Sequence, residues 1–307
     1  MLTSFFGKSN PINFIIAGVY ICIGYVFAIS SDILELLALP IIAQHFFFLV
    51  ISFFSMLLLD FIIKKNKLTK GNTFGILFFT CFMVMLPAVF LNHSFLISNI
   101  LILLALRRIL SLDSEKNSEK KILDATIWIT LASFFYFYSL LLFAVLFIAI
   151  LKKPYTHYKL VLIPVVGFMG VFFLATAVHF LIDDSFQWFF EWKTPISFDF
   201  SAYNKKSIVI PVAVIITLLI WTGTTRLLSI TKLSKKERPR FLMQLFILGI
   251  TICMILASSI KTGAELIFMF APTAIIVSNY IEILKEFWFR EFILWLVVLV
   301  PILVFIL

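Results

Sequence analysis

The chain is dominated by long apolar runs that recur along its whole length. Most of them have the roughly 17 to 25 residues that a helix needs to cross a bilayer. The runs are apolar on every face, whereas strands of outer-membrane barrels alternate in polarity over about ten residues. With 62% hydrophobic and only 13% charged residues among 307, a water-soluble globule is excluded. The sequence therefore predicts an all-α, polytopic transmembrane helix bundle. The expected crossings are 12–29, 39–63, 73–91, 95–110, 122–151, 160–182, 207–228, 241–257, 266–283 and 292–307.

The run 122–151 is ambiguous, because thirty residues suit either one long crossing or a hairpin. Short loops that are rich in Lys and Arg stay cytoplasmic. A single crossing would place the basic segments 152–159 and 236–240 on opposite sides of the membrane. A hairpin that turns near "FFYFYS" (134–139) keeps every basic connection inside. We therefore expect a hairpin and about eleven membrane helices, or ten if this run crosses once.

The distribution of basic residues predicts the orientation. In this arrangement 21 of the 25 Lys and Arg residues face the cytoplasm, and only Lys193, Lys205, Lys206 and Lys261 lie outside. The prediction is a multi-pass protein of the inner (cytoplasmic) membrane, with a cytoplasmic N-terminus and a periplasmic C-terminus. The basic excess indicates contact with anionic lipid headgroups. Nucleic acid is not an expected partner, because no soluble basic domain accompanies it.

The connections are too short to hold a soluble domain. The longest, 183–206, has 24 residues, so residues 1–307 are expected to form a single integral membrane domain. No Gly-rich phosphate motif is present, which excludes ATP hydrolysis. The three cysteines lie inside apolar runs without a Cys or His at ligand spacing, so they predict no metal site.

Acidic, basic and aromatic residues converge only on the predicted extracytoplasmic surface. "SSDILE" (30–35) places Asp32 and Glu35 in the first external loop. They are three residues apart and would share a face on a helical turn, which suits either a joint site or a solvated turn. The segment "SFQWFFEWK" (185–193) has the spacing of an amphipathic interfacial helix. It would serve as an aromatic anchor or as a lid over a lipid-facing groove.

Other polar residues lie within or near the crossings. Asp60 and Asp124 are expected to pair with neighbouring lysines at the membrane boundary. His45, Asn99 and His179 are expected to form hydrogen bonds between helices or to contact a substrate.

Three stretches carry a resemblance to a known family. They are "MLTSFFGKSNPINF", "LALRRILSL" and "DATIWITLASFFYFYSLLLFAVLFIAILKKPY". Together they resemble an uncharacterised family of polytopic inner-membrane proteins from Bacteroidota, a domain of unknown function, and the likeness covers most of the chain. This family name implies no activity.

A more distant likeness is to the membrane half of the GT-C glycosyltransferases, which use polyprenyl-phosphate sugars. It rests on the order of the helices, the acidic first external loop, the "LALRR" helix end and the short-armed hairpin. That resemblance implies that Asp32 or Glu35 is a catalytic general base or a ligand of a divalent metal, although no cofactor is otherwise evident. It also implies that Lys193, Lys205, Lys206 or Lys261 binds the lipid phosphate. The first loop departs from the GT-C pattern, because only about nine residues separate the runs and no second acidic pair follows.

Two other functions remain open. The chain is alternatively a non-catalytic accessory subunit that packs against other inner-membrane proteins, for example through the aromatic residues 134–137. A transporter of lipids or small molecules is the third reading, although no internal repeat supports it.

Overall fold

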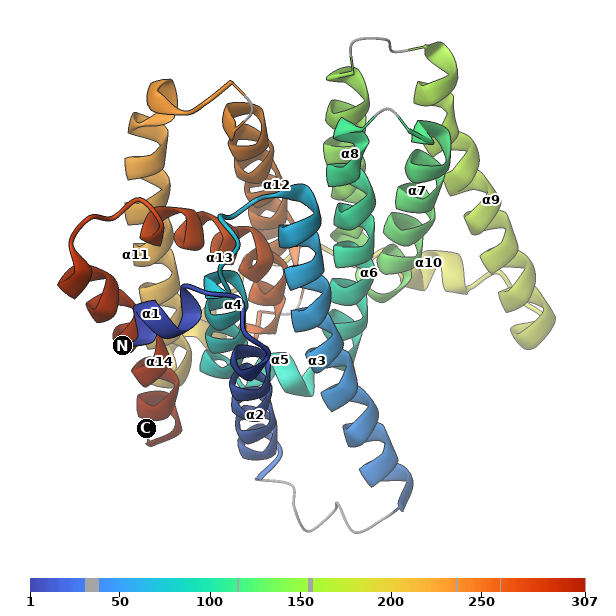
Figure 1. Ribbon diagram of the computed structural model, residues 1–307. Helices are drawn as coiled ribbons and strands as arrows, with labels where there is room; N and C mark the ends of the chain where they lie inside the picture. The colour runs from blue at the N-terminus through green and yellow to red at the C-terminus, as the bar shows by residue number, and fades with distance from the viewer. Residues whose placement is uncertain (31–38, 115, 154–156, 236, 260, 307) are drawn as a thin grey trace. The chain divides into compact units, whose positions relative to one another are not determined.

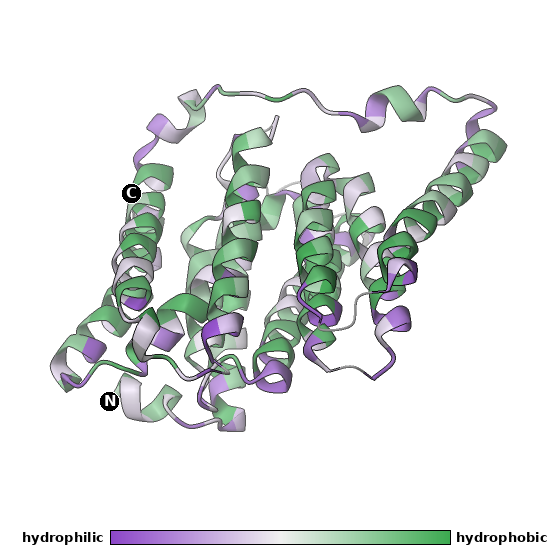
Figure 2. Cartoon of the chain, turned by 90° about the horizontal axis from the view of Figure 1, so that it is seen from above, coloured by the Kyte–Doolittle hydropathy of each residue, from purple (hydrophilic) through white to green (hydrophobic). Residues whose placement is uncertain are grey.

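The protein is all-α over the residues that the structure describes. The computed structural model describes residues 1–306 except 31–38, 115, 154–156, 236 and 260, and no strand occurs among them (Figure 1). Eight helices in this part of the chain are long and apolar enough to cross a membrane. Hydrophilic residues gather near helix ends and connections (Figure 2). The chain is thus a multi-pass membrane protein, and the number of crossings stays a prediction.

The described residues form two compact units, which we treat separately. Unit 1 comprises 1–96, 199–248 and 261–307, and unit 2 comprises 97–198 and 249–260. The prediction of a single integral membrane domain stays a prediction.

Helices α6 and α12 contribute residues to both units. The α-helices of unit 1 are α1 (Leu2–Phe6), α2 (Pro11–Ala28), α3 (Leu39–Asn66), α4 (Phe74–Met85), α5 (Ala88–Leu91), α11 (Lys206–Leu228), α13 (Ile267–Ile281) and α14 (Phe287–Ile306). Those of unit 2 are α7 (Ser118–Phe135), α8 (Leu142–Leu151), α9 (Tyr158–Asp183) and α10 (Trp188–Trp192), and the shared helices are α6 (His93–Leu110) and α12 (Glu237–Ala257). Short 3-10 helices are η3 (Ser111–Asp113), η4 (Phe137–Leu141), η5 (Ser201–Asn204), η6 (Ile230–Lys232) and η7 (Ala264–Leu266).

Helix α4 lies in the core of unit 1. All twelve of its residues are buried, and α13, α2, α14 and α3 pack against it. At about 1.5 Å per residue its length is about 18 Å, short of the roughly 30 Å of a bilayer core. The helix ends before Pro87, which lacks a backbone N–H group, and the chain continues as α5. The predicted crossing 73–91 is therefore two helices in the structure.

Two glycines bring α2 close to its neighbours. A Cβ atom added at Gly24 would lie 2.7 and 2.8 Å from the two methyl carbons of Val84 on α4. One added at Gly18 would lie 2.0 Å from the ring of Phe53 on α3. Small residues at such positions allow helix backbones to approach closely in membranes. This packing fixes the position of Tyr25, the residue that follows Gly24.

In unit 2, α7 and α8 form the predicted hairpin. The helix breaks at Tyr136, whose backbone is extended (φ −149°, ψ 102°), and η4 leads into α8. The ammonium group of Lys153, just after α8, donates a hydrogen bond to the hydroxyl of Ser118 at the start of α7. The two arms lie side by side in Figure 1. The predicted reversal near 134–139 is thus confirmed as a helix hairpin.

The predicted interfacial helix is present but short. Helix α10 covers only Trp188–Trp192. The indole N–H of Trp192 donates to the carbonyl oxygen of Ser133 at 2.8 Å, and its ring contacts Phe134, Phe137 and Phe172. The aromatic segment is therefore held on unit 2 by ring packing.

The same contacts correct one expectation. Residues 134–137 were expected to offer an exposed aromatic patch to a partner. Tyr136 is instead buried, and its hydroxyl donates to the carbonyl oxygen of Met254. Phe134 and Phe137 pack against Trp192, which leaves Phe135 as the exposed member. The segment mainly serves the internal packing of unit 2.

Candidate functional site

The strongest cluster of ionisable groups with a predicted functional role lies at one end of unit 1. Here the connection 261–265 meets η5, the first turn of α11, and α5. We call this region, which holds Lys205, Lys206 and Lys261, the lysine end.

Glu265 and Lys261 are both buried, with exposed fractions of 0% and 6%. The Tyr203 hydroxyl donates to Oε1 of Glu265 at 2.7 Å, and the backbone N–H of Thr262 donates to Oε2 at 3.2 Å. The Lys261 ammonium group lies over the ring of Phe200, 4.9 Å from its centre. Removing a carboxylate and a cation from water is costly unless they are paired or hydrogen-bonded. These side chains therefore either have a function or hold the 261–265 connection in place.

Burial and charge act in opposite directions on Lys261. Burial lowers the pKa of its ammonium group, and the nearby carboxylate of Glu265 raises it in part. Burial is also the main reason why the pKa of Tyr203 is raised, with a further contribution from Glu265. Tyr203 therefore stays protonated at neutral pH and donates its hydrogen bond.

The other two lysines of this end are exposed where α11 begins. Lys205 caps the helix and Lys206 is its first residue. The same first turn approaches the 261–265 connection, because a Cβ atom on Gly263 would lie 3.4 Å from Ile208. The backbone N–H groups of a helix N-terminus add partial positive charge. Three of the four predicted phosphate-binding lysines thus lie at one end of unit 1.

A second polar group lies at the end of α2 and the start of α3, and it contains His45, which was expected to form a hydrogen bond between helices or to contact a substrate. The Tyr25 hydroxyl and Nδ1 of His45 share a hydrogen bond of 3.0 Å, and Nε2 of Gln44 lies 3.2 Å from Nδ1 of His93. The His93 ring stacks on Phe48. His93 lies just beyond α5, which packs against η7. The expected role of His45 in a hydrogen bond between helices is confirmed.

The remaining predicted site residues lie elsewhere. Asp32 and Glu35 fall outside the described residues, although they belong to the connection between α2 and α3. Lys193 is exposed after α10 and belongs to unit 2. Within the described ranges, no three His, Cys, Asp or Glu side chains are placed to hold a metal ion.

The other polar residues form ion pairs and ring contacts. Asp60 pairs with Lys64 at 2.8 Å, as expected. Asp124 pairs with Arg108 at 2.8 Å, whereas a neighbouring lysine was expected. His179 lies 3.5 Å from Asp183 and stacks on Trp188, so its contacts are local to unit 2.

Comparison with known proteins adds a family but no activity. No curated protein and no solved structure matches the chain. A family model described as a family of unknown function, DUF6427, matches residues 6–307. Because that match covers nearly the whole chain, the protein belongs to this family of unknown function.

Proposed function

We propose that this membrane protein binds a lipid-linked phosphate, of the polyprenyl-phosphate-sugar type, at its lysine end. The observation that carries the proposal is that Lys205, Lys206 and Lys261 lie at the same end of unit 1 as the buried Glu265 and its half-buried hydrogen-bond partner Tyr203. Buried ionisable residues in a membrane protein are candidates for a functional site. A phosphate at the membrane boundary needs cations beside it, and this end supplies three.

Each group has a distinct role in this proposal. Lys205 and Lys206 are exposed and meet the phosphate first, with the N-terminus of α11 adding to their charge. Lys261 lies deeper, beneath Phe200, so the connection that carries Phe200 acts as a cover. Glu265 and Tyr203 hold the cover through their hydrogen bond.

In the catalytic version of this proposal, the protein is related to the GT-C glycosyltransferases and transfers the sugar from the bound lipid to an acceptor. Asp32 or Glu35 would then take the proton of the acceptor hydroxyl at the extracytoplasmic face of an inner membrane. The acceptor oxygen would bond to the anomeric carbon of the sugar as the polyprenyl phosphate leaves. Loss of a general base typically lowers a rate by a factor of about 10² to 10⁴. We therefore expect Asp32→Asn or Glu35→Gln to leave lipid binding intact and to abolish transfer from a polyprenyl-phosphate sugar, measured by product formation in vesicles.

Binding is tested with the full chain purified in mild detergent. The probe is a polyprenyl phosphate, compared with the matching polyprenol, and binding is measured by native mass spectrometry. The variant Lys205→Gln with Lys206→Gln removes two exposed charges and should not affect folding. The control Lys285→Gln removes an exposed charge from a connection predicted to lie on the opposite membrane face.

The expected result is selective binding of the phosphate form by the wild type and by the control. The Lys205 and Lys206 double variant should bind about tenfold more weakly or worse, since a hydrogen bond to a charged group contributes about 1.5 to 3 kcal/mol. Equal binding of polyprenol and polyprenyl phosphate would contradict the proposal, as would unchanged binding by the double variant.

One observation favours an accessory role as a second candidate. Helix α9 buries only 11% of its membrane-span residues within the chain, the lowest share among the eight candidate spans. Its exposed apolar residues include Phe173, Leu174 and Leu181. Co-purification of a second membrane protein that is lost in Phe173→Ser with Leu174→Ser, but retained in the Lys205 and Lys206 variant, would support this candidate.

A further inference from the structure

Unit 1 contains a cavity of about 280 Å³ away from the lysine end. It lies where α11 ends, α12 begins and α13 ends, and the connection between α3 and α4 closes it. Its lining residues include Lys67, Lys70, Arg226, Glu237, Arg240, Gln244 and Glu282. This is the end of the unit that the basic connections predict to be cytoplasmic. We call it the basic cavity.

Positive charge dominates the lining. The lining holds four cationic residues, Lys67, Lys70, Arg226 and Arg240, and two acidic ones, Glu237 and Glu282. The carboxylates already accept hydrogen bonds from the chain. Glu282 accepts from the backbone N–H of Lys70 at 2.7 Å and from the Asn72 amide, and Glu237 accepts from the backbone N–H of Ser234 at 3.3 Å. The cavity is therefore suited to an anion.

Two buried donors in the lining have no acceptor within the protein. Gln244 is only 3% exposed, and its Nε2 group makes no hydrogen bond. The Nε group of Arg226 is also buried without a partner, while its guanidinium lies 5.8 Å from the ring centre of Phe241. A buried donor without an acceptor costs about 1 to 3 kcal/mol. Both residues belong to the lining of the same cavity, and a ligand that carries acceptor oxygens would relieve this cost.

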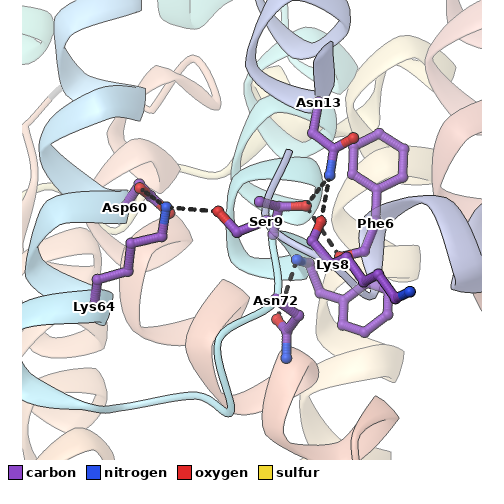
Figure 3. A network of polar contacts seen from close by, with 9 residues as sticks. Phe6, Lys8, Ser9, Asn13, Asp60, Lys64 and Asn72 are labelled. Atoms are coloured by element: carbon purple, nitrogen blue, oxygen red, sulfur yellow. Dashed lines mark hydrogen bonds and ion pairs between the residues drawn. The ribbon is translucent and has the colours of Figure 1, made fainter. Parts of the chain in front are cut away.

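The connection that closes the cavity is held in place before a ligand arrives. Asn13 donates to the Thr73 hydroxyl at 2.6 Å and to the Lys8 carbonyl oxygen at 2.8 Å. Nearby, the ammonium group of Lys64 forms an ion pair with Asp60 and donates a hydrogen bond to the Ser9 hydroxyl (Figure 3). These contacts fasten the N-terminal segment to α3 and to the start of α4. Together with the hydrogen bond from the backbone N–H of Lys70 to Glu282, they anchor the backbone of the connection that carries Lys67 and Lys70, which reduces the entropy lost on binding.

We propose that the basic cavity binds a phosphate group, carried by a lipid headgroup or by a soluble anion. Arginine is suited to this role, because its planar guanidinium matches the geometry of phosphate oxygens. Gln244 donates to a further oxygen, and Lys67 and Lys70 supply charge at the mouth. Basic pockets between helices at the cytoplasmic side of membranes are suited to anionic headgroups.

The test measures thermal unfolding of the full chain in detergent by tryptophan fluorescence. Inorganic phosphate is titrated against chloride at constant ionic strength, and phosphatidylglycerol is compared with phosphatidylcholine in mixed micelles. The variants Arg226→Gln and Gln244→Met each remove donors from the lining, and the second keeps the side-chain length. The control Arg238→Gln removes an exposed charge from the first turn of α12, outside the lining.

We expect the unfolding midpoint to rise with the ligand, as binding to the folded state requires. The apparent affinity should fall about tenfold or more in Arg226→Gln, fall less in Gln244→Met, and stay unchanged in Arg238→Gln. A rise with phosphatidylglycerol alone identifies a headgroup, a rise with phosphate alone identifies a soluble anion, and a rise with both identifies the phosphate group as sufficient.

No rise with either ligand would overturn the proposal. An undiminished rise in both lining variants would also overturn it, and if Arg226→Gln does not fold, Gln244→Met alone decides. The Lys205 and Lys206 double variant should leave this response unchanged, so failure here is distinguishable from failure at the lysine end.

Discussion

Replacing Gly24 by alanine tests how α2 is seated on the core helix α4. The new Cβ atom would lie 2.7 and 2.8 Å from the methyl carbons of Val84, and 3.2 Å from its Cβ atom. Val84 is fully buried and cannot turn aside, so α2 and α4 must move apart by several tenths of an ångström. Overpacking of this kind costs about 1 to 3 kcal/mol.

The net effect is smaller, because alanine stabilises a helix by about 1 kcal/mol relative to glycine. A matched control isolates the two contributions. Gly170 lies inside α9 with no atom within 4 Å of its added Cβ, so Gly170→Ala should be neutral or stabilising. The difference between the two variants should therefore be about 1 to 3 kcal/mol. Such a difference shifts the unfolding midpoint by roughly a few degrees.

The assay is thermal unfolding in detergent, monitored by tryptophan fluorescence. Adding Val84→Ala removes both clashing methyl groups and should recover part of the loss, so the two substitutions should be non-additive. If Gly24→Ala is as stable as Gly170→Ala, the close packing of α2 on α4 is refuted. The positioning of Tyr25 beside His45 would then lose its explanation.

Three further outcomes are expected. Lys261→Met should destabilise the protein, because it removes a buried cation whose charge interacts with the carboxylate of Glu265. Adding Glu265→Gln should recover part of that loss. An equal loss in the single and the double variant, measured by thermal unfolding, would contradict this electrostatic coupling. Trp192→Ala should expose residues 183–198 to limited proteolysis. The control Phe190→Ala should not, because the Phe190 side chain is already 78% exposed. Equal cleavage of the two variants would contradict the packing of α10 on unit 2. In a cysteine-free background, Ser234→Cys should be labelled from the cytoplasmic side and Lys206→Cys from the opposite side; the reverse pattern would overturn the orientation.

Helix positions in the long spans follow closely from the sequence. The predicted crossing 207–228 is α11 (Lys206–Leu228), and 95–110 lies within α6 (His93–Leu110). Both spans are long, apolar and bounded by charged or polar residues. The hairpin of α7 and α8 was also predictable, because the basic segments on either side required a reversal.

The position of α4 in the core was not predictable by the same reasoning. Its residues are apolar on all sides, so periodicity gives no buried face, and only Pro87 signals that the run 73–91 breaks. The hydrogen bond between Tyr203 and Glu265 was also not predictable, because 62 residues separate the two partners in the sequence. Lys261 and Glu265 were both assigned to the external surface, but their burial depends on tertiary packing.

The basic cavity illustrates the same limit. Lys67, Lys70, Arg226 and Arg240 were interpreted only as indicators of orientation. Gln244 lies in an apolar run and gave no signal by itself. The cavity exists because the ends of α11, α12 and α13 meet the connection after α3, which requires contacts between segments more than 150 residues apart.

The central claim is that the lysine end binds a lipid-linked phosphate. Its most direct test is lipid analysis by mass spectrometry of the protein purified from its native membrane in mild detergent. We predict that a polyprenyl phosphate or its sugar conjugate co-purifies with the wild type, far above its share of the bulk lipid, and is depleted in the Lys205→Gln and Lys206→Gln double variant. Recovery of bulk phospholipid alone from the wild type, in membrane proportions, would contradict the claim.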